Sequence, residues 1–141
     1  MPRKILILVG GFLTIAWGTA HMFPTNSVVK GFGNISTDNT LVITMEWINE
    51  GMTLIFIGLL VIAVTVFGDI TSKVVKIVYL LASLMLFAMA VLSVFTGFKI
   101  HFLPYQLCPF IFSLSGILIL QGILYKKDKP FSSRTINNKW K

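Results

Sequence analysis

The chain has 141 residues, of which 55% are hydrophobic and only 12% are charged, and its formal net charge is +7. Soluble domains carry about 25% charged residues, and one this small could not bury so much apolar surface. A disordered chain is also excluded, because so many large apolar side chains would collapse. The composition therefore predicts an integral membrane protein.

Four apolar stretches are long enough to cross a hydrocarbon core about 30 Å thick, which takes about 20 helical residues. Each stretch is continuous rather than alternating, which favours helices over the strands of a membrane barrel. We therefore expect one all-α domain over residues 1–141, an integral membrane bundle of four transmembrane helices. The expected helices lie at about 5–23, 41–67, 74–98 and 107–125, with a basic cytoplasmic tail at 126–141.

The first apolar stretch also has the features of a signal peptide. Arg3 and Lys4 precede the apolar run from Ile5 to Ala16, and Gly18-Thr19-Ala20 resembles a cleavage site. Cleavage would leave three spans in place of four. We favour an uncleaved first helix.

The basic residues predict the orientation of the helices. Ten lysines and arginines flank the expected spans on the side that holds both termini, whereas only Lys30 and Lys99 lie on the other side. The positive-inside rule then places both termini in the cytoplasm. We expect a multi-pass protein of the plasma membrane, which in a bacterium is the inner membrane. We also expect its basic residues to contact membrane lipids. Nucleic acid is not an expected partner, because the tail lacks the length and interleaved aromatics of a binding arm.

Small residues predict which helices touch, because lipid provides no hydrophobic drive between membrane helices and close backbone approach takes its place. Gly11 and Gly18 lie two turns apart on the first expected helix, as do Gly51 and Gly58 on the second. Consecutive helices run antiparallel, so we expect Gly18 to face Gly51 and Gly11 to face Gly58.

Ionisable side chains within membrane segments are costly and usually functional. Glu46 and Glu50 are four residues apart and so share one helix face. Together with groups from the same leaflet they suit a proton relay, cation binding or recognition of a polar head group. The candidate residues for ligand binding or proton relay are His21, Glu46, Trp47, Glu50, His101 and Tyr105.

A purely structural alternative applies to four of these residues. In it, the two glutamates begin an amphipathic turn at the membrane surface, Trp47 is an interfacial anchor, and His101 is a solvated loop residue.

Other chemistry is less well supported. The residues show neither the His-x-x-x-His nor the Glu-x-x-His spacing that would fix a metal, so we predict no metal site. Cys108 is the one cysteine, which excludes an intrachain disulfide and leaves a small hydrophobic side chain. No nucleophilic triad can be assembled, so catalytic residues are unknown.

The connection at 24–40 contains Gly31-Phe32-Gly33 and several turn-forming residues. This pattern indicates a structured lid rather than a loose link. We expect Phe32 to dip back over the polar residues.

The arrangement resembles the small four-helix DoxX-like membrane proteins. The resemblance rests on Gly10-Gly11-Phe12-Leu13 through Gly18, on Glu50-Gly51 and Leu54, on Gly58-Leu59-Leu60, and on a short turn at Gly68 before an Ala/Leu/Met-rich helix. The resemblance implies a protein that serves as a membrane partner of oxidoreductases. Some members of the family are linked to thiosulfate and quinone, and many have no assigned activity. Glu50 is the one polar position that it carries over. The long 24–40 connection and Met45-Glu46-Trp47 depart from the family pattern.

Our leading hypothesis is a non-catalytic membrane component. It would bind a hydrophobic or amphipathic ligand, or a partner protein, through an outer-leaflet pocket, and no cofactor is predicted. One alternative is a quinone-linked membrane oxidoreductase subunit, with quinone as the cofactor and His21 and Glu50 exchanging protons. Another alternative is a proton-coupled transporter. Because four helices are few for a transporter, the chain would have to form a homo-oligomer.

Overall fold

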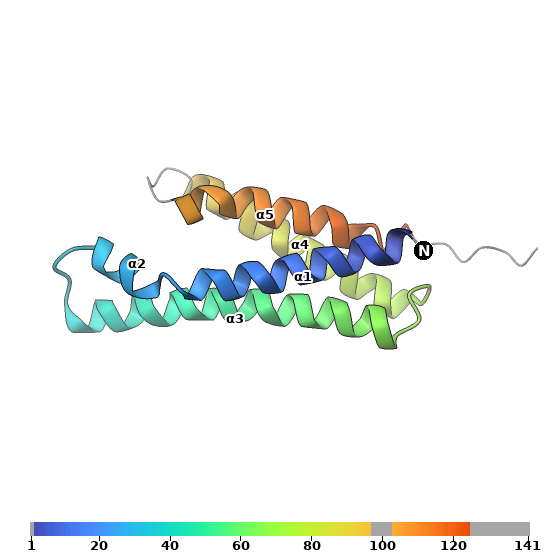
Figure 1. Ribbon diagram of the computed structural model, residues 1–141, viewed down its shortest axis with the longest axis horizontal. Helices are drawn as coiled ribbons and strands as arrows, with labels where there is room; N and C mark the ends of the chain where they lie inside the picture. Colours follow the sequence, from blue (N-terminus) through green and yellow to red (C-terminus); the bar gives the residue numbers. More distant parts are fainter. Residues whose placement is uncertain (1, 97–102, 125–141) are drawn as a thin grey trace, which may run out of the picture.

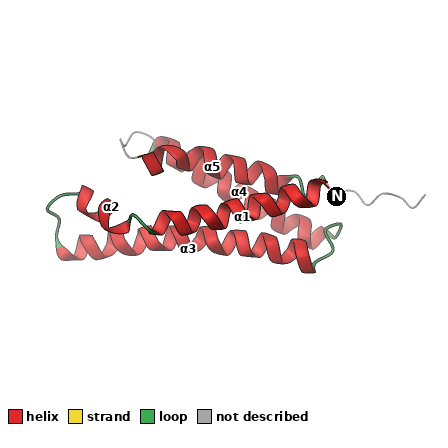
Figure 2. Cartoon of the chain, in the orientation of Figure 1, coloured by secondary structure: helices red, strands yellow, loops and turns green. Residues whose placement is uncertain are grey.

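The computed structural model describes residues 2–96 and 103–124, and within them the chain forms helices and no strand (Figure 1). The expectation of an all-α fold is therefore confirmed for this part of the chain. Short connections separate the helices from α1 to α4 (Figure 2). In chain order the helices are α1 (Pro2–Met22), α2 (Thr25–Gly31), α3 (Thr37–Phe67), α4 (Lys73–Phe95) and α5 (Leu103–Leu120).

Three of these helices are long and apolar enough to cross a membrane. They contain the segments Arg3–Met22, Thr37–Phe67 and Lys73–Phe95. The apolar part of α5, Gln106–Leu120, is shorter. At 1.5 Å per residue, α3 is about 46 Å long and so exceeds a hydrocarbon core of about 30 Å.

Helix α3 begins at Thr37, four residues before the expected start at 41, because Ser36 caps it. The Ser36 hydroxyl accepts a hydrogen bond from the backbone N–H of Asn39 at 3.2 Å, which satisfies one of the free donors of the first turn. Ser72 caps α4 in the same way, accepting from the N–H of Val75 at 3.2 Å. Both helices therefore have starts that local side chains determine.

The helices are arranged as two antiparallel pairs. Helix α1 packs mainly along α3, α4 packs along α5, and α1 also contacts α5 and so joins the pairs. Helices α3 and α4 lie close at the short turn that connects them and diverge from there toward the α2 end of the bundle (Figure 1). The two pairs are therefore separated most at that end.

The predicted glycine contacts between the first two long helices are confirmed. A Cβ added at Gly18 would lie 2.7 Å from the carbonyl oxygen of Gly51, and one added at Gly58 would lie 2.6 Å from the carbonyl oxygen of Gly11. Real side chains do not approach backbone so closely. The backbones of α1 and α3 can touch at these two points only because glycine occupies all four positions.

Polar contacts close the opposite end of the bundle, where α3 ends and α4 begins. The hydroxyls of Thr65 and Tyr79 are 3.0 Å apart and join α3 to α4, while Thr65 also donates to the carbonyl of Val61. Gly122 lies directly against the ring of Tyr79. The Arg3 guanidinium donates to the carbonyl of Leu124, which links the start of α1 to the segment that follows α5.

Replacing Gly58 with alanine tests the contact between α1 and α3. The Cβ would meet the backbone of Gly11 and the Ile15 side chain, so we expect Gly58→Ala to lower the free energy of unfolding by about 2 kcal/mol, the usual cost of overpacking. Thermal unfolding in a mild detergent measures this loss.

Gly31→Ala is the matched control, because no heavy atom of the described chain lies within 4 Å of a Cβ added there. It should unfold at the wild-type temperature or above it. If Gly58→Ala is as stable as Gly31→Ala, the close glycine contact is not needed.

Candidate functional site

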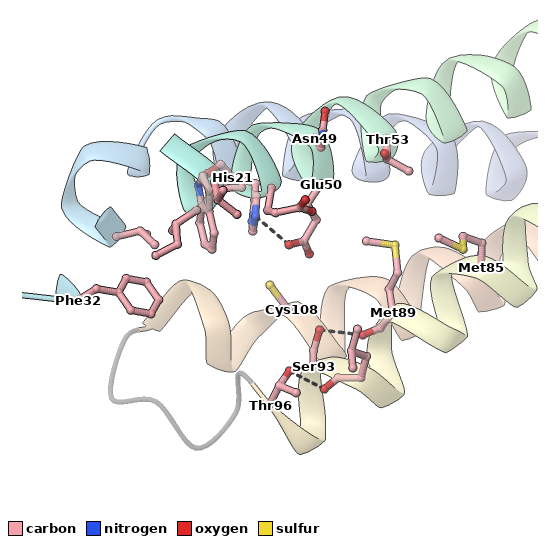
Figure 3. Close-up of a pocket in the computed structure, with 16 residues that line it drawn as sticks. His21, Phe32, Asn49, Glu50, Thr53, Met85, Met89, Ser93, Thr96 and Cys108 are labelled. Carbon is pink, nitrogen blue, oxygen red and sulfur yellow. Dashed lines mark hydrogen bonds and ion pairs between the residues drawn. The ribbon is translucent and has the colours of Figure 1, made fainter. Parts of the chain in front are cut away.

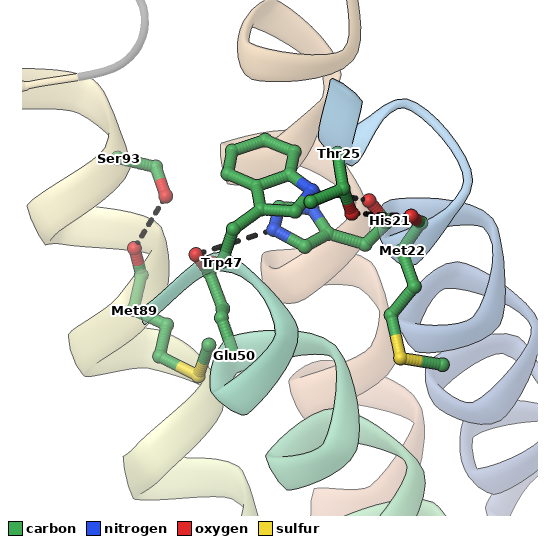
Figure 4. A network of polar contacts seen from close by, with 7 residues as sticks. All are labelled: His21, Met22, Thr25, Trp47, Glu50, Met89 and Ser93. Carbon is green, nitrogen blue, oxygen red and sulfur yellow. Dashed lines mark hydrogen bonds and ion pairs between the residues drawn. The ribbon is translucent and has the colours of Figure 1, made fainter. Parts of the chain in front are cut away.

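The site begins at the C-terminal end of α1. His21 lies in the last turn of this helix, where backbone carbonyls have no partner within the helix. The indole Nε1 of Trp47 donates to the His21 carbonyl at 2.7 Å, and the hydroxyl of Thr25 donates to the next carbonyl, that of Met22, at 2.5 Å. Side chains from α3 and α2 thus complete the end of α1 (Figure 4).

Trp47 also holds the side chain of His21. The two rings are stacked with centroids 3.8 Å apart and planes 19° from parallel. Both residues are buried, with exposed fractions of 3% for His21 and 6% for Trp47. The indole of Trp47 is therefore buried against His21 rather than exposed on the surface of the bundle.

Glu50 lies about one turn after Trp47 on α3 and approaches the imidazole edge. Its Oε2 is 3.3 Å from Nε2 of His21, and its side chain remains 35% exposed while that of His21 is 1% exposed. Within the described chain, neither ring nitrogen of His21 has a partner aligned for a hydrogen bond. A buried polar group of this kind is unusual, and it makes His21 a candidate for contact with a ligand.

These residues line a cleft of about 560 Å³ between the two helix pairs (Figure 3). The α3 wall of the cleft carries its acidic and polar side chains, Glu46, Asn49, Glu50 and Thr53, beside the apolar Val42 and Ile43. The α4 wall has Met85, Met89, Leu92, Ser93 and Thr96, and α5 adds the buried Cys108. The cleft therefore combines a charged side with an apolar side.

The hydroxyls of the α4 wall have their donors engaged. Ser93 donates to the carbonyl of Met89 and Thr96 to that of Leu92, each at 2.8 Å (Figure 3). These hydroxyls therefore offer lone pairs rather than protons to anything in the cleft, and the thioethers of Met85 and Met89 are the most prominent groups beside them.

The structure brings four of the six predicted site residues together. His21, Glu46, Trp47 and Glu50 all line the cleft, Glu46 with an exposed side chain. The side chain of Tyr105 and the whole of His101 lie outside the described residues.

Sequence reasoning missed two groups of cleft residues. Asn49 and Thr53 lie three residues after Glu46 and Glu50, so helical spacing could have found them. The α4 residues carry no such signal, because a methionine that lines a cleft looks like one that faces lipid.

The connection at 24–40 is structured in part, and it contributes Val28 and Phe32 to the lining of the cleft. Its residues 25–31 form α2, which the sequence did not reveal, and Val28 from this helix is buried in the cleft wall. Phe32 lines the rim but is 54% exposed, so it covers the polar residues only in part.

Among the described residues, no three His, Cys, Asp or Glu side chains are grouped closely enough to hold a metal ion. Comparison with known proteins adds no assignment: no family model, curated protein or solved structure matches the chain.

Trp47→Phe tests the link between α3 and the end of α1. Phenylalanine keeps an aromatic ring against His21 but cannot donate to its carbonyl, so we expect a loss of about 1 kcal/mol in unfolding free energy, the net value of one hydrogen bond. Chemical or thermal unfolding in detergent provides the measurement.

Trp17→Phe removes the same ring volume and is the control. The buried Nε1 of Trp17 makes no hydrogen bond to a nitrogen or oxygen atom of the described chain, and the Cys108 thiol beside it is a weak acceptor, so the loss is mainly one of packing. Equal destabilisation of the two variants would show that the Trp47 hydrogen bond contributes nothing.

Proposed function

We propose that this chain is a four-helix membrane protein that binds a hydrophobic or amphipathic molecule, or a partner protein, in the cleft at its α2 end, without catalysing a reaction. In this proposal α5 is the fourth span, both termini lie in the cytoplasm, and the membrane is a bacterial inner membrane. The distribution of lysine and arginine supports this orientation, in which the cleft lies in the outer leaflet.

One observation carries the proposal. A buried histidine without hydrogen-bond partners in the described chain, and a partly exposed glutamate beside it, open into a cleft whose other wall is apolar. A site that needs only apolar contacts would not maintain such groups, since they are costly in a membrane. Few polar groups in a mainly apolar cavity of this size are typical of small-molecule sites.

The position of the cleft also gives a ligand access from the bilayer. Val42 on α3 and Leu92 on α4 line the cleft and are 52% and 62% exposed. Both lie where α3 and α4 diverge, so apolar side chains border the opening. A molecule dissolved in the lipid could therefore move into the cleft sideways without crossing a polar barrier.

The resemblance to DoxX-like proteins supports a partner role in the same proposal. If it holds, a membrane or redox partner protein docks on this chain, and Glu50 is the position that the family shares with it. Co-purification of an oxidoreductase subunit that is lost in Glu50→Gln would support this.

A quinone-linked oxidoreductase subunit is the alternative, and one observation favours it. The 3.3 Å between His21 Nε2 and Glu50 Oε2 is short enough for this pair to hold and pass a proton. Quinone reduction by the purified protein that Glu50→Gln abolishes would establish this alternative. Absence of turnover with a panel of electron donors would favour binding alone.

Filling the cleft tests the proposed function. Met85 and Met52 are both exposed methionines of membrane helices, but only Met85 is among the residues that line the cleft. We expect 1-dodecanol to raise the unfolding temperature of the wild type and of Met52→Trp in a saturable way, because a ligand that binds only the folded state stabilises it. Met85→Trp should lose this response.

Thermal unfolding in phosphatidylcholine nanodiscs at increasing dodecanol provides the measurement. An identical rise in all three proteins would mean that the amphiphile acts through the lipid, and the cleft would not be its binding site.

A further inference from the structure

We propose that the ligand of this cleft is a cationic amphiphile, whose protonated amine pairs with Glu50 and Glu46 and whose hydrocarbon chain lies along the α4 wall. This inference rests on the proposed function and names the chemical class of the ligand. Three features of the cleft support it: its charge, the state of His21 and the nature of the opposite wall.

The charge of the cleft selects against anions. Glu46 and Glu50 both line it, and its described lining contains no lysine or arginine. A fatty acid or a phosphate head would place negative charge beside two carboxylates with no lysine or arginine in the described wall to offset it. An ammonium head would instead form charge-assisted hydrogen bonds with them, which are the strong ones.

Of the two ring nitrogens of a neutral His21, one donates and the other accepts, and a hydrogen-bond donor in the cleft can partner the accepting one. In the described chain both ring nitrogens are buried and lack an aligned partner, although Nε2 is only 3.3 Å from Glu50. A neutral imidazole has one nitrogen that accepts, and an ammonium group has three N–H donors and no acceptor. One ammonium at this point could donate to the Glu50 carboxylate and to His21 together.

Trp47 holds His21 in place, so the imidazole cannot reach another hydrogen-bond partner by moving. The indole stacks on the imidazole at 3.8 Å and also holds the His21 carbonyl at 2.7 Å, so both the ring and the backbone are fixed. Glu50, which is 35% exposed, is the partner that can turn toward a ligand (Figure 4).

The opposite wall fits a hydrocarbon chain. Met85, Met89 and Leu92 lie on it, and thioether side chains adapt readily to an irregular apolar shape. The hydroxyls of Ser93 and Thr96 already donate to carbonyls of their own helix, so they have no proton left for an anionic head. The polarity of the cleft thus runs from acidic on α3 to apolar on α4.

The test compares three probes with the same chain: dodecylamine, 1-dodecanol and dodecanoate. Each is titrated into the full-length protein in phosphatidylcholine nanodiscs at pH 7, and its affinity is obtained from the rise in unfolding temperature. We expect dodecylamine to bind most tightly and dodecanoate least. Glu50→Gln should weaken dodecylamine by about tenfold, the loss expected for one hydrogen bond to a charged group, and should leave dodecanol unchanged.

Asp38→Asn is the matched control. It removes one carboxylate from the first turn of the same helix, where Asp38 is exposed and is not among the described residues of the cleft. Its affinity for dodecylamine should equal that of the wild type. If Glu50→Gln does not fold, Glu46→Gln replaces it, since the exposed Glu46 side chain tolerates the change and should weaken dodecylamine in the same direction.

The outcomes separate this inference from the function on which it rests. If dodecanol or dodecanoate binds as tightly as dodecylamine and Met85→Trp abolishes the binding, the cationic ligand is refuted and the cleft remains a binding site. An equal loss of dodecylamine affinity in Asp38→Asn and Glu50→Gln also refutes it, because the effect is then one of general charge. If no probe binds in a way that Met85→Trp abolishes, both proposals fail.

Discussion

The close backbone contact between α1 and α3 at two glycine pairs is the constraint on which the rest of the structure depends. It fixes the register of the two antiparallel helices, because Gly18 and Gly51 must face each other. His21 lies about one turn after Gly18 and Trp47 about one turn before Gly51, so the same register brings these two residues together. The candidate site is therefore a direct consequence of a packing contact that uses none of the candidate side chains.

The cleft exists because the bundle is closed at one end and open at the other. At the closed end the Thr65–Tyr79 contact and the short turn hold α3 against α4. Toward the α2 end α4 follows α5, to which the buried Ser83 hydroxyl binds it through the carbonyl of Gly116 at 3.1 Å. Since α1 holds α3 and α5 holds α4, the two helices diverge, and the space between them is the cleft.

The sequence predicts the parts of this structure that depend on rare residues. Glycines two turns apart identify the contact of α1 with α3, and glutamates in an apolar segment identify the acidic wall of the cleft. The α4 wall could not be predicted, since divergence of two helices is a property of the whole bundle and Met89 has no local mark. Helix α2 is short and lacks a side-chain cap at Pro24, so its pattern resembles that of a loop. The start of α3 could have been predicted from Ser36, whose hydroxyl caps the helix by accepting from the backbone N–H of Asn39. Hydropathy alone overlooks this signal.

The arrangement of the three central side chains explains how an acidic site can persist in such an apolar chain. Trp47 fixes His21 through both its ring and its carbonyl, which commits the imidazole to one position at the edge of the cleft. The Glu50 carboxylate then lies 3.3 Å from Nε2 of His21, but the two groups are not aligned for a hydrogen bond. A tighter pair would be more stable, but it would leave neither His21 nor Glu50 open to a partner in the cleft. The loose pair gives up part of that stability, and an occupant that donates hydrogen bonds to both residues would recover it.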